Sequence, residues 1–225
     1  MISRPARTLC RLLCFATLIS LGGLRTAAAH PHVFVEGGVS FVLDEEQRLT
    51  ALEVTWHYDL FETLFVLSSI KVTPQPDGGL TPEDRQKISD FMTDWPPEYK
   101  GSAHLSHVGE DLELVRPSQM EVALIDGKLV MRFERDLADP ISMPGQVAEV
   151  GFYESTYYYA FTVTEPTGVL GSGKDSPCSA RVIPFDPNAD LEALQVSLFD
   201  LGREDIPEEP NVGALFADRI ELACD

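Results

Sequence analysis

Apolar and polar residues alternate along two neighbouring stretches near the start of the chain, residues 32–43 and 48–58. Apolar side chains fall mainly at odd positions in the first stretch and at even positions in the second. Because successive side chains of a strand point to opposite faces, this pattern is typical of strands with one face on a core. The segment between them, 44–47, is wholly polar, so the pattern predicts a β-hairpin.

Both apolar sets of the hairpin must face the same core. This fixes the parity of the pairing, since a one-residue slip would turn one strand over. With a symmetric turn, we expect His32 opposite Asp59 and Phe34 opposite His57. Diagonal neighbours in a hairpin are about 7–8 Å apart. Two imidazoles and a carboxylate would therefore approach one point on the polar face.

Residues 59–95 are expected to form a helix–loop–helix insertion. The run 59–70 is apolar on too many sides for a surface strand and has leucines at helical spacing, which predicts a buried helix. Thr81 and Pro82 then mark the N-cap and first position of a second helix, which should end near Asp94.

The remainder of the chain is predicted to consist mainly of strands. Asp126-Gly127 lies between two apolar runs, 121–125 and 129–133, and is a strong signal for a tight hairpin. Further strands are expected at 147–153, 157–164, 178–183 and 219–224, helical segments at 190–200 and 212–216, and loops at 165–177 and 201–210.

These elements predict a single α+β domain over residues 30–225. Its body should be mainly antiparallel β, arranged as a sandwich-like pair of sheets or a strongly bent sheet. Outside the leader the cysteines are Cys178 and Cys224. An even pair in an exported chain usually forms a disulfide, so we expect one to hold the C-terminal segment. A thiolate metal pair is the weaker alternative, because no Cys-x-x-Cys spacing is present.

The first 29 residues have the features of a signal peptide. Arginines precede an apolar run at 12–24, and Ala27-Ala28-Ala29 matches a small-residue cleavage site. The apolar run is shorter than the roughly 20 residues that span a membrane. We therefore expect cleavage after Ala29, a periplasmic mature protein and no stable membrane anchor.

The net charge of the chain is −19 at pH 7, and the leader contributes four arginines and no acid, so the mature charge would be −23. A nucleic-acid partner is not expected, since binding to phosphates needs a basic surface. An acidic surface concentrates cations, although it also simply keeps a protein soluble.

Cleavage after Ala29 would leave His30 with a free α-amine beside its imidazole. Pro31 has no N–H, which blocks the usual amino-terminal copper and nickel motif. Any divalent transition-metal site must then use side chains, and the hairpin offers His32, His57 and Asp59. A frayed terminus and a solvated sheet face are the alternatives. Weaker ligand candidates are Glu36, His107 and Glu154.

Four tyrosines, Tyr153 and Tyr157–Tyr159, form an aromatic cluster in the sequence. Such clusters usually pack a core, but a carbohydrate or peptide groove is the alternative. We assign no catalytic residues, because the sequence has no Gly-x-Ser-x-Gly elbow and no free cysteine expected after export.

Short motifs follow one another along the mature chain at residues 30–34, 54–59, 77–84, 152–158, Cys178 and 215–224. In the order and spacing of these motifs, the chain resembles a family of exported bacterial proteins described as periplasmic components of an unassigned ABC-type transport system. Family members often stand beside genes for nickel/cobalt-type transporters. The resemblance therefore implies periplasmic metal handling with a membrane metal transporter as partner.

The chain departs from the pattern of that family in one loop and at one position. A calcium-loop-like stretch retains only Asp77 and Asp84 as acidic ligands, with Thr73 and Gln75 at the other positions, so we expect no tight calcium site. Glu154 stands where the family pattern has Asp.

The leading functional expectation is a periplasmic protein that binds nickel, cobalt, zinc or copper and acts as an accessory or chaperone to a transporter. A binding module for a non-metal ligand or an envelope protein is one alternative. A copper redox enzyme that uses the N-terminal histidine is the other.

Overall fold

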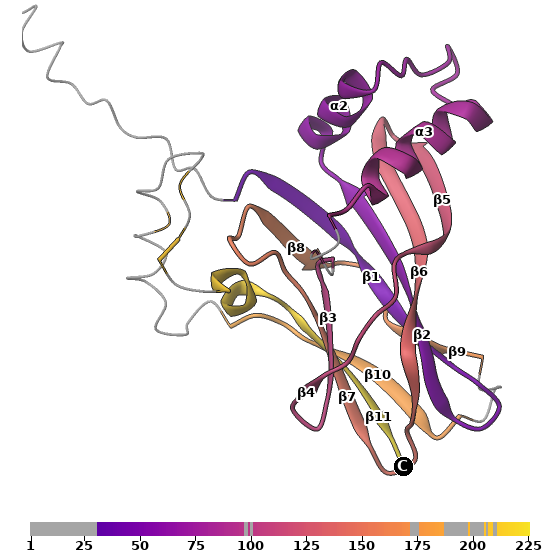
Figure 1. Cartoon of the computed structure of the whole chain (residues 1–225), viewed down its shortest axis with the longest axis vertical. Helices are drawn as coiled ribbons and strands as arrows, with labels where there is room; N and C mark the ends of the chain where they lie inside the picture. Colours follow the sequence, from indigo (N-terminus) through magenta and orange to yellow (C-terminus); the bar gives the residue numbers. More distant parts are fainter. Residues whose placement is uncertain are drawn as a thin grey trace, which may run out of the picture.

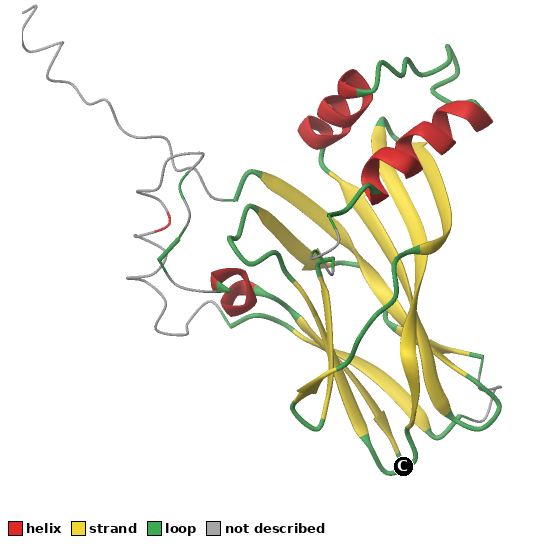
Figure 2. Ribbon diagram, viewed as in Figure 1, coloured by secondary structure: helices red, strands yellow, loops and turns green. Residues whose placement is uncertain are grey.

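Two β-sheets form the body of the protein in this computed structural model, and two helices lie at one end of them (Figures 1 and 2). The structure describes residues 31–96, 99, 101–171, 176–186, 198, 205, 207–208 and 211–225. The predicted signal peptide and His30 lie outside the described residues. So do all but Leu198 of the helix expected at 190–200 and most of the loop expected at 201–210.

The larger sheet has the strand order β5–β6–β2–β1–β8, and β9 also pairs with β1. Its neighbours run antiparallel, except that β8 and β9 both run parallel to β1. Its strands are β1 (Val33–Leu43), β2 (Arg48–Tyr58), β5 (Ser118–Ile125), β6 (Lys128–Ser142), β8 (Tyr159–Val163) and β9 (Gly168–Leu170). The loop expected at 165–177 therefore contains a short strand, β9.

The smaller sheet has the order β10–β11–β7–β3–β4 and is antiparallel throughout. Its strands are β3 (Ala103–His107), β4 (Glu110–Asp111), β7 (Val147–Phe152), β10 (Cys178–Ile183) and β11 (Arg219–Cys224). The helical turn expected before the last strand is present as a 3-10 helix, η1 (Val212–Phe216).

The β1–β2 hairpin has the predicted faces, but its register differs from the symmetric one. Glu36 pairs with His57, the position where we expected Phe34. The backbone N–H of Asp59 donates to the carbonyl of Phe34 at 3.0 Å, so Asp59 lies beside Phe34 and not opposite His32. The turn is one residue longer than expected and a β-bulge adds another. These two additions together preserve the parity and hence the apolar face.

Both predicted helices of the insertion are present, as α2 (Leu60–Ser69) and α3 (Pro82–Thr93). Thr81 caps α3 by accepting a hydrogen bond from the backbone N–H of Asp84 at 3.1 Å, as the sequence predicted. Figure 1 shows both helices at the end of the molecule where β2 ends and where β5 turns into β6.

The expectation that the first of these helices is buried is wrong. Four large apolar side chains of α2 are half or more exposed, and Phe61 is the most exposed at 84%. The buried positions are Thr63, Val66 and Leu67. The helix packs only one narrow face, because it lies at the end of the sheet and not between layers.

Apolar side chains from both sheets form the main core, with Phe41, Leu52, Leu105 and Leu222 among the most deeply buried. Cys178 and Cys224 pair across β10 and β11 and form the predicted disulfide. The mainly antiparallel α+β fold class is thereby confirmed. No helix within the described ranges is long and apolar enough to cross a membrane.

Candidate functional site

Asp59, one of the predicted metal ligands, acts as a structural link between β1 and α2. Its Oδ1 accepts from the backbone N–H of Glu62 at 2.8 Å, and its Oδ2 accepts from the backbone N–H of Phe34 at 2.8 Å. The first bond satisfies a helix donor that would otherwise lack a partner. Both carboxylate oxygens are therefore engaged in positioning the backbone.

His57 lies on the outer face of the larger sheet, and its Nε2 is 2.7 Å from Oε1 of Glu165. Glu36 is its cross-strand neighbour on β1. The structure thus brings His57 together with Glu165, a residue that sequence reasoning missed, and not with Asp59. Glu165 could not be inferred because it follows β8, which pairs with β1 in parallel across a long connection.

The remaining predicted histidine ligands do not converge with His57. The ring of His32 packs against Tyr158, with 4.7 Å between the ring centroids. His107 ends β3 in the smaller sheet, and His30 lies outside the described residues. In the part of the chain that the structure describes, no group of three His, Cys, Asp or Glu side chains could hold a metal ion.

Glu154, the third weaker ligand candidate, stabilises the connection between β7 and β8. Its Oε1 accepts from the backbone N–H of Thr156, and its Oε2 accepts from the backbone N–H of Tyr158, both at 2.9 Å. These bonds hold the backbone two and four residues after Glu154.

The carboxylates of the degenerate calcium loop also serve the local backbone. Asp77 Oδ1 accepts from the backbone N–H of Gly79 at 2.9 Å. Asp84 Oδ2 accepts from the hydroxyl of Thr81 at 2.6 Å. The first bond closes a turn between the helices, and the second joins the N-cap to the first turn of α3.

A hollow of about 540 Å³, which we call the aromatic cavity, lies beneath the two helices and is lined by 14 residues, nine of them aromatic. One wall belongs to the larger sheet and consists of Trp56, Tyr58, Tyr159 and Phe161. Trp56 anchors this wall, because its ring lies edge-on to Phe133 with a centroid distance of 4.9 Å and is 8% exposed.

The two helices form the second wall of the aromatic cavity, through Glu62, Phe65, Phe91 and Met92. Phe65 and Phe91 are 57% and 41% exposed, so they stand at the mouth. The connecting segments complete the lining with Trp95, Tyr99, Ser102, Glu154, Thr156 and Tyr158. Segments far apart in sequence thus meet around one space.

Glu62 is the acidic side chain of the helical wall. The hydroxyl of Tyr159 donates to Glu62 Oε1 at 3.2 Å. Burial raises the pKa of Glu62, and the nearby Asp59 charge raises it further, whereas the Tyr159 hydrogen bond acts in the opposite direction. Burial likewise raises the pKa of Tyr58 and of Tyr159, and the charge of Glu62 adds to both shifts.

Trp95 is held in place from outside the aromatic cavity by a buried arginine. The guanidinium of Arg135 lies 5.4 Å from the centroid of the Trp95 ring, and Arg135 is 1% exposed. It donates to the carbonyls of Leu114 and Val115. Burial lowers the pKa of Arg135 to about 10, which still leaves it charged at neutral pH. The indole N–H of Trp95 donates to the Met92 carbonyl at 2.8 Å.

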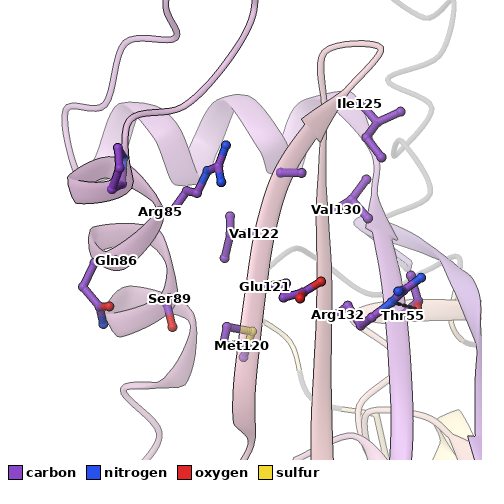
Figure 3. A pocket seen from close by; sticks show the side chains of 12 residues that line it. Thr55, Arg85, Gln86, Ser89, Met120, Glu121, Val122, Ile125, Val130 and Arg132 are labelled. Atoms are coloured by element: carbon purple, nitrogen blue, oxygen red, sulfur yellow. Dashed lines mark hydrogen bonds between the residues drawn. The ribbon is translucent and has the colours of Figure 1, made fainter.

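A second hollow of about 620 Å³ lies between α3 and the strands β5 and β6 (Figure 3). Arg85 and Ser89 face it from the helix, and Glu121 and Arg132 from the sheet. Glu121 and Arg132 are cross-strand partners, so their charges offset each other. None of the described residues that line it is aromatic, which distinguishes it from the aromatic cavity.

The tyrosine cluster was one signal in the sequence for the aromatic cavity, since Tyr158 and Tyr159 both line it. Glu62, Phe65 and Trp95 were missed. The pattern of α2 gave a further hint, because its large apolar side chains occur around more of the helix than one buried face can hold.

Comparison with known proteins identifies a family for this chain. A family model described as "Protein of unknown function (DUF1007)" matches residues 15–224. No curated protein matches. A crystal structure of AChBP from Bulinus truncatus is 12% identical and covers 94% of this chain and 96% of that chain, with a TM-score of 0.38. A likeness at that TM-score carries no argument about this chain.

Proposed function

Because this chain belongs to the DUF1007 family of proteins of unknown function, we propose its function from its own geometry: it binds a small organic molecule in the aromatic cavity. The observation that carries this proposal is a hollow of about 540 Å³ lined by nine aromatic side chains. Ligand sites are typically about 300–1,000 Å³, with mostly apolar walls and a few placed polar groups. The hydroxyl of Tyr159 and the carboxylate of Glu62 supply such polar groups.

The mouth of the aromatic cavity supports the same proposal. Phe65 and Phe91 leave large apolar surfaces in water at the entrance. Contiguous exposed apolar surface on a folded protein commonly marks a site that another molecule covers. A ligand with an apolar body would cover these rings from the inside.

We also propose that the protein acts after export to the periplasm. The features of residues 1–29 support cleavage after Ala29, and the Cys178–Cys224 disulfide is compatible with an oxidising compartment. Sequencing the amino terminus of protein recovered from the periplasm tests this. A terminus at Met1 would contradict it.

A role in transition-metal handling beside a transporter stays a sequence-based prediction. His57 with Glu165 is the pair in the described residues that favours it. Bound metal should be measured by mass spectrometry for protein that begins at His30 and for a version with one extra alanine. If neither version binds metal with high affinity, this function is ruled out. If both versions bind equally, a role of the free amine is ruled out.

The binding proposal can be tested with N-phenyl-1-naphthylamine, a neutral probe whose fluorescence rises in apolar surroundings. Phe65→Ala and Phe61→Ala form a matched pair, because both are exposed phenylalanines of α2 and only Phe65 lines the cavity. We expect saturable binding that Phe65→Ala weakens by roughly three- to ten-fold, as for loss of an aromatic contact. Phe61→Ala should leave it unchanged. No saturable binding, or equal loss in both variants, would overturn the proposal.

A further inference from the structure

The charged side chains among the described residues that line the aromatic cavity are all acidic. These are Glu62 and Glu154, and no basic side chain is among the described residues that line the cavity. The Glu154 oxygens are occupied by the turn between β7 and β8. Glu62 accepts one hydrogen bond, from Tyr159. The carboxylate of Glu62 is therefore the charged group best placed to meet a ligand.

Aromatic faces surround this carboxylate. Tyr58 and Tyr159 are close enough for Glu62 to shift the pKa of both. Phe65 lies on the same helix, and Trp56 and Trp95 line the same space. An aromatic face attracts a cation through its quadrupole, and desolvation strengthens that attraction. Rings arranged around one carboxylate favour a positively charged group over a neutral or anionic one.

Resting on the proposed function, we infer that the ligand of the aromatic cavity is an organic cation, an ammonium group on an apolar body, with Glu62 as its counter-charge. The ammonium group contacts the aromatic faces, and the apolar body extends toward Phe65 and Phe91 at the mouth. An anionic ligand would bring its charge against Glu62. A neutral sugar would leave the charge of Glu62 without a partner in a half-buried site, which is unfavourable.

Arg135 does not oppose this inference. Its guanidinium lies 5.4 Å from the centroid of the Trp95 ring, and Arg135 is not among the described residues that line the cavity. It is held by the carbonyls of Leu114 and Val115. Arg135 therefore supports the Trp95 ring without lining the cavity; burial raises the pKa of Tyr99, and the charge of Arg135 lowers it.

The charge itself can be tested with choline and its neutral isostere 3,3-dimethylbutan-1-ol, which differ by nitrogen against carbon at one position. Both tryptophans of the chain line the cavity, so their intrinsic fluorescence reports on its occupancy. Displacement of N-phenyl-1-naphthylamine gives an independent reading. We expect choline to act at roughly ten-fold lower concentration than the isostere, from cation–π and ionic attraction.

Glu62→Gln retains the size of the side chain and an acceptor for Tyr159. It should weaken choline by roughly ten-fold and leave the isostere unchanged. Glu83→Gln, on the exposed side of α3, removes the same charge outside the cavity and serves as the control. Equal affinity for choline and the isostere in the unaltered protein would overturn the inference, while retained binding of the naphthylamine probe would leave the proposed function standing. Equal losses in Glu62→Gln and Glu83→Gln would overturn the role of Glu62.

Discussion

Replacement of Asp59 tests the structural role of its carboxylate. Asp59→Ala removes two hydrogen bonds, from the backbone N–H groups of Glu62 and Phe34, each at 2.8 Å. Loss of an N-cap costs about 0.5–2 kcal/mol, and a charge-assisted bond at a partly exposed position contributes about 1 kcal/mol. We expect a loss of about 1.5–3 kcal/mol in the free energy of unfolding.

For a domain of this size, such a loss corresponds to a decrease in Tm of roughly 3–12 °C. Urea unfolding followed by circular dichroism measures the free energy directly. Asp59→Asn should lose about half as much, because Asn is also a good N-cap. Asp77→Ala is the control, since its carboxylate makes one bond in an exposed loop. A loss for Asp59→Ala no larger than for Asp77→Ala would refute the reasoning.

Three further predictions concern the support of the site, the disulfide and pH. Arg135→Met should cost about 3 kcal/mol, because it removes two charge-assisted hydrogen bonds, to the carbonyls of Leu114 and Val115, of about 1.5 kcal/mol each, and urea unfolding and the tryptophan emission should both change. Replacing Cys178 and Cys224 by alanine should cost about 4 kcal/mol in the chain-entropy model for a separation of 46 residues; an unchanged urea midpoint would contradict this. The raised pKa of Glu62 means that folded Glu62 holds its proton more tightly than the unfolded chain does. Its contribution to stability is therefore largest below its ordinary pKa and is lost as pH rises through the raised value. Choline affinity should change in the opposite sense, falling as pH falls through that raised value, and Glu62→Gln should flatten this dependence in titrations at pH 4–8.

The sequence predicts the strands and the parity of the hairpin faces, because side-chain periodicity is a local property. Register depends on the length of one turn and on a bulge, and for that reason His57 lies opposite Glu36. The disulfide was predictable because only two cysteines remain after the expected cleavage.

The presence of a helix at 59–70 was predictable from its pattern, but its burial was not. Burial depends on which element packs against the helix, and α2 lies at the end of the sheet with few neighbours. The aromatic cavity combines β2, β8, both helices and two connecting segments. The parallel pairing of β8 with β1 brings Tyr159 to Glu62, and no short-range pattern records that contact.

If the aromatic cavity is the ligand site of this protein, it should bind a small aromatic compound in a crystal. Crystals soaked with 4-bromobenzyl alcohol, a neutral aromatic compound, allow its bromine to be located by anomalous diffraction. We expect a peak among Trp56, Trp95 and Phe65, which weakens in Phe65→Ala crystals. Bromine only in the hollow between α3 and β5, or only at scattered surface positions, would contradict it.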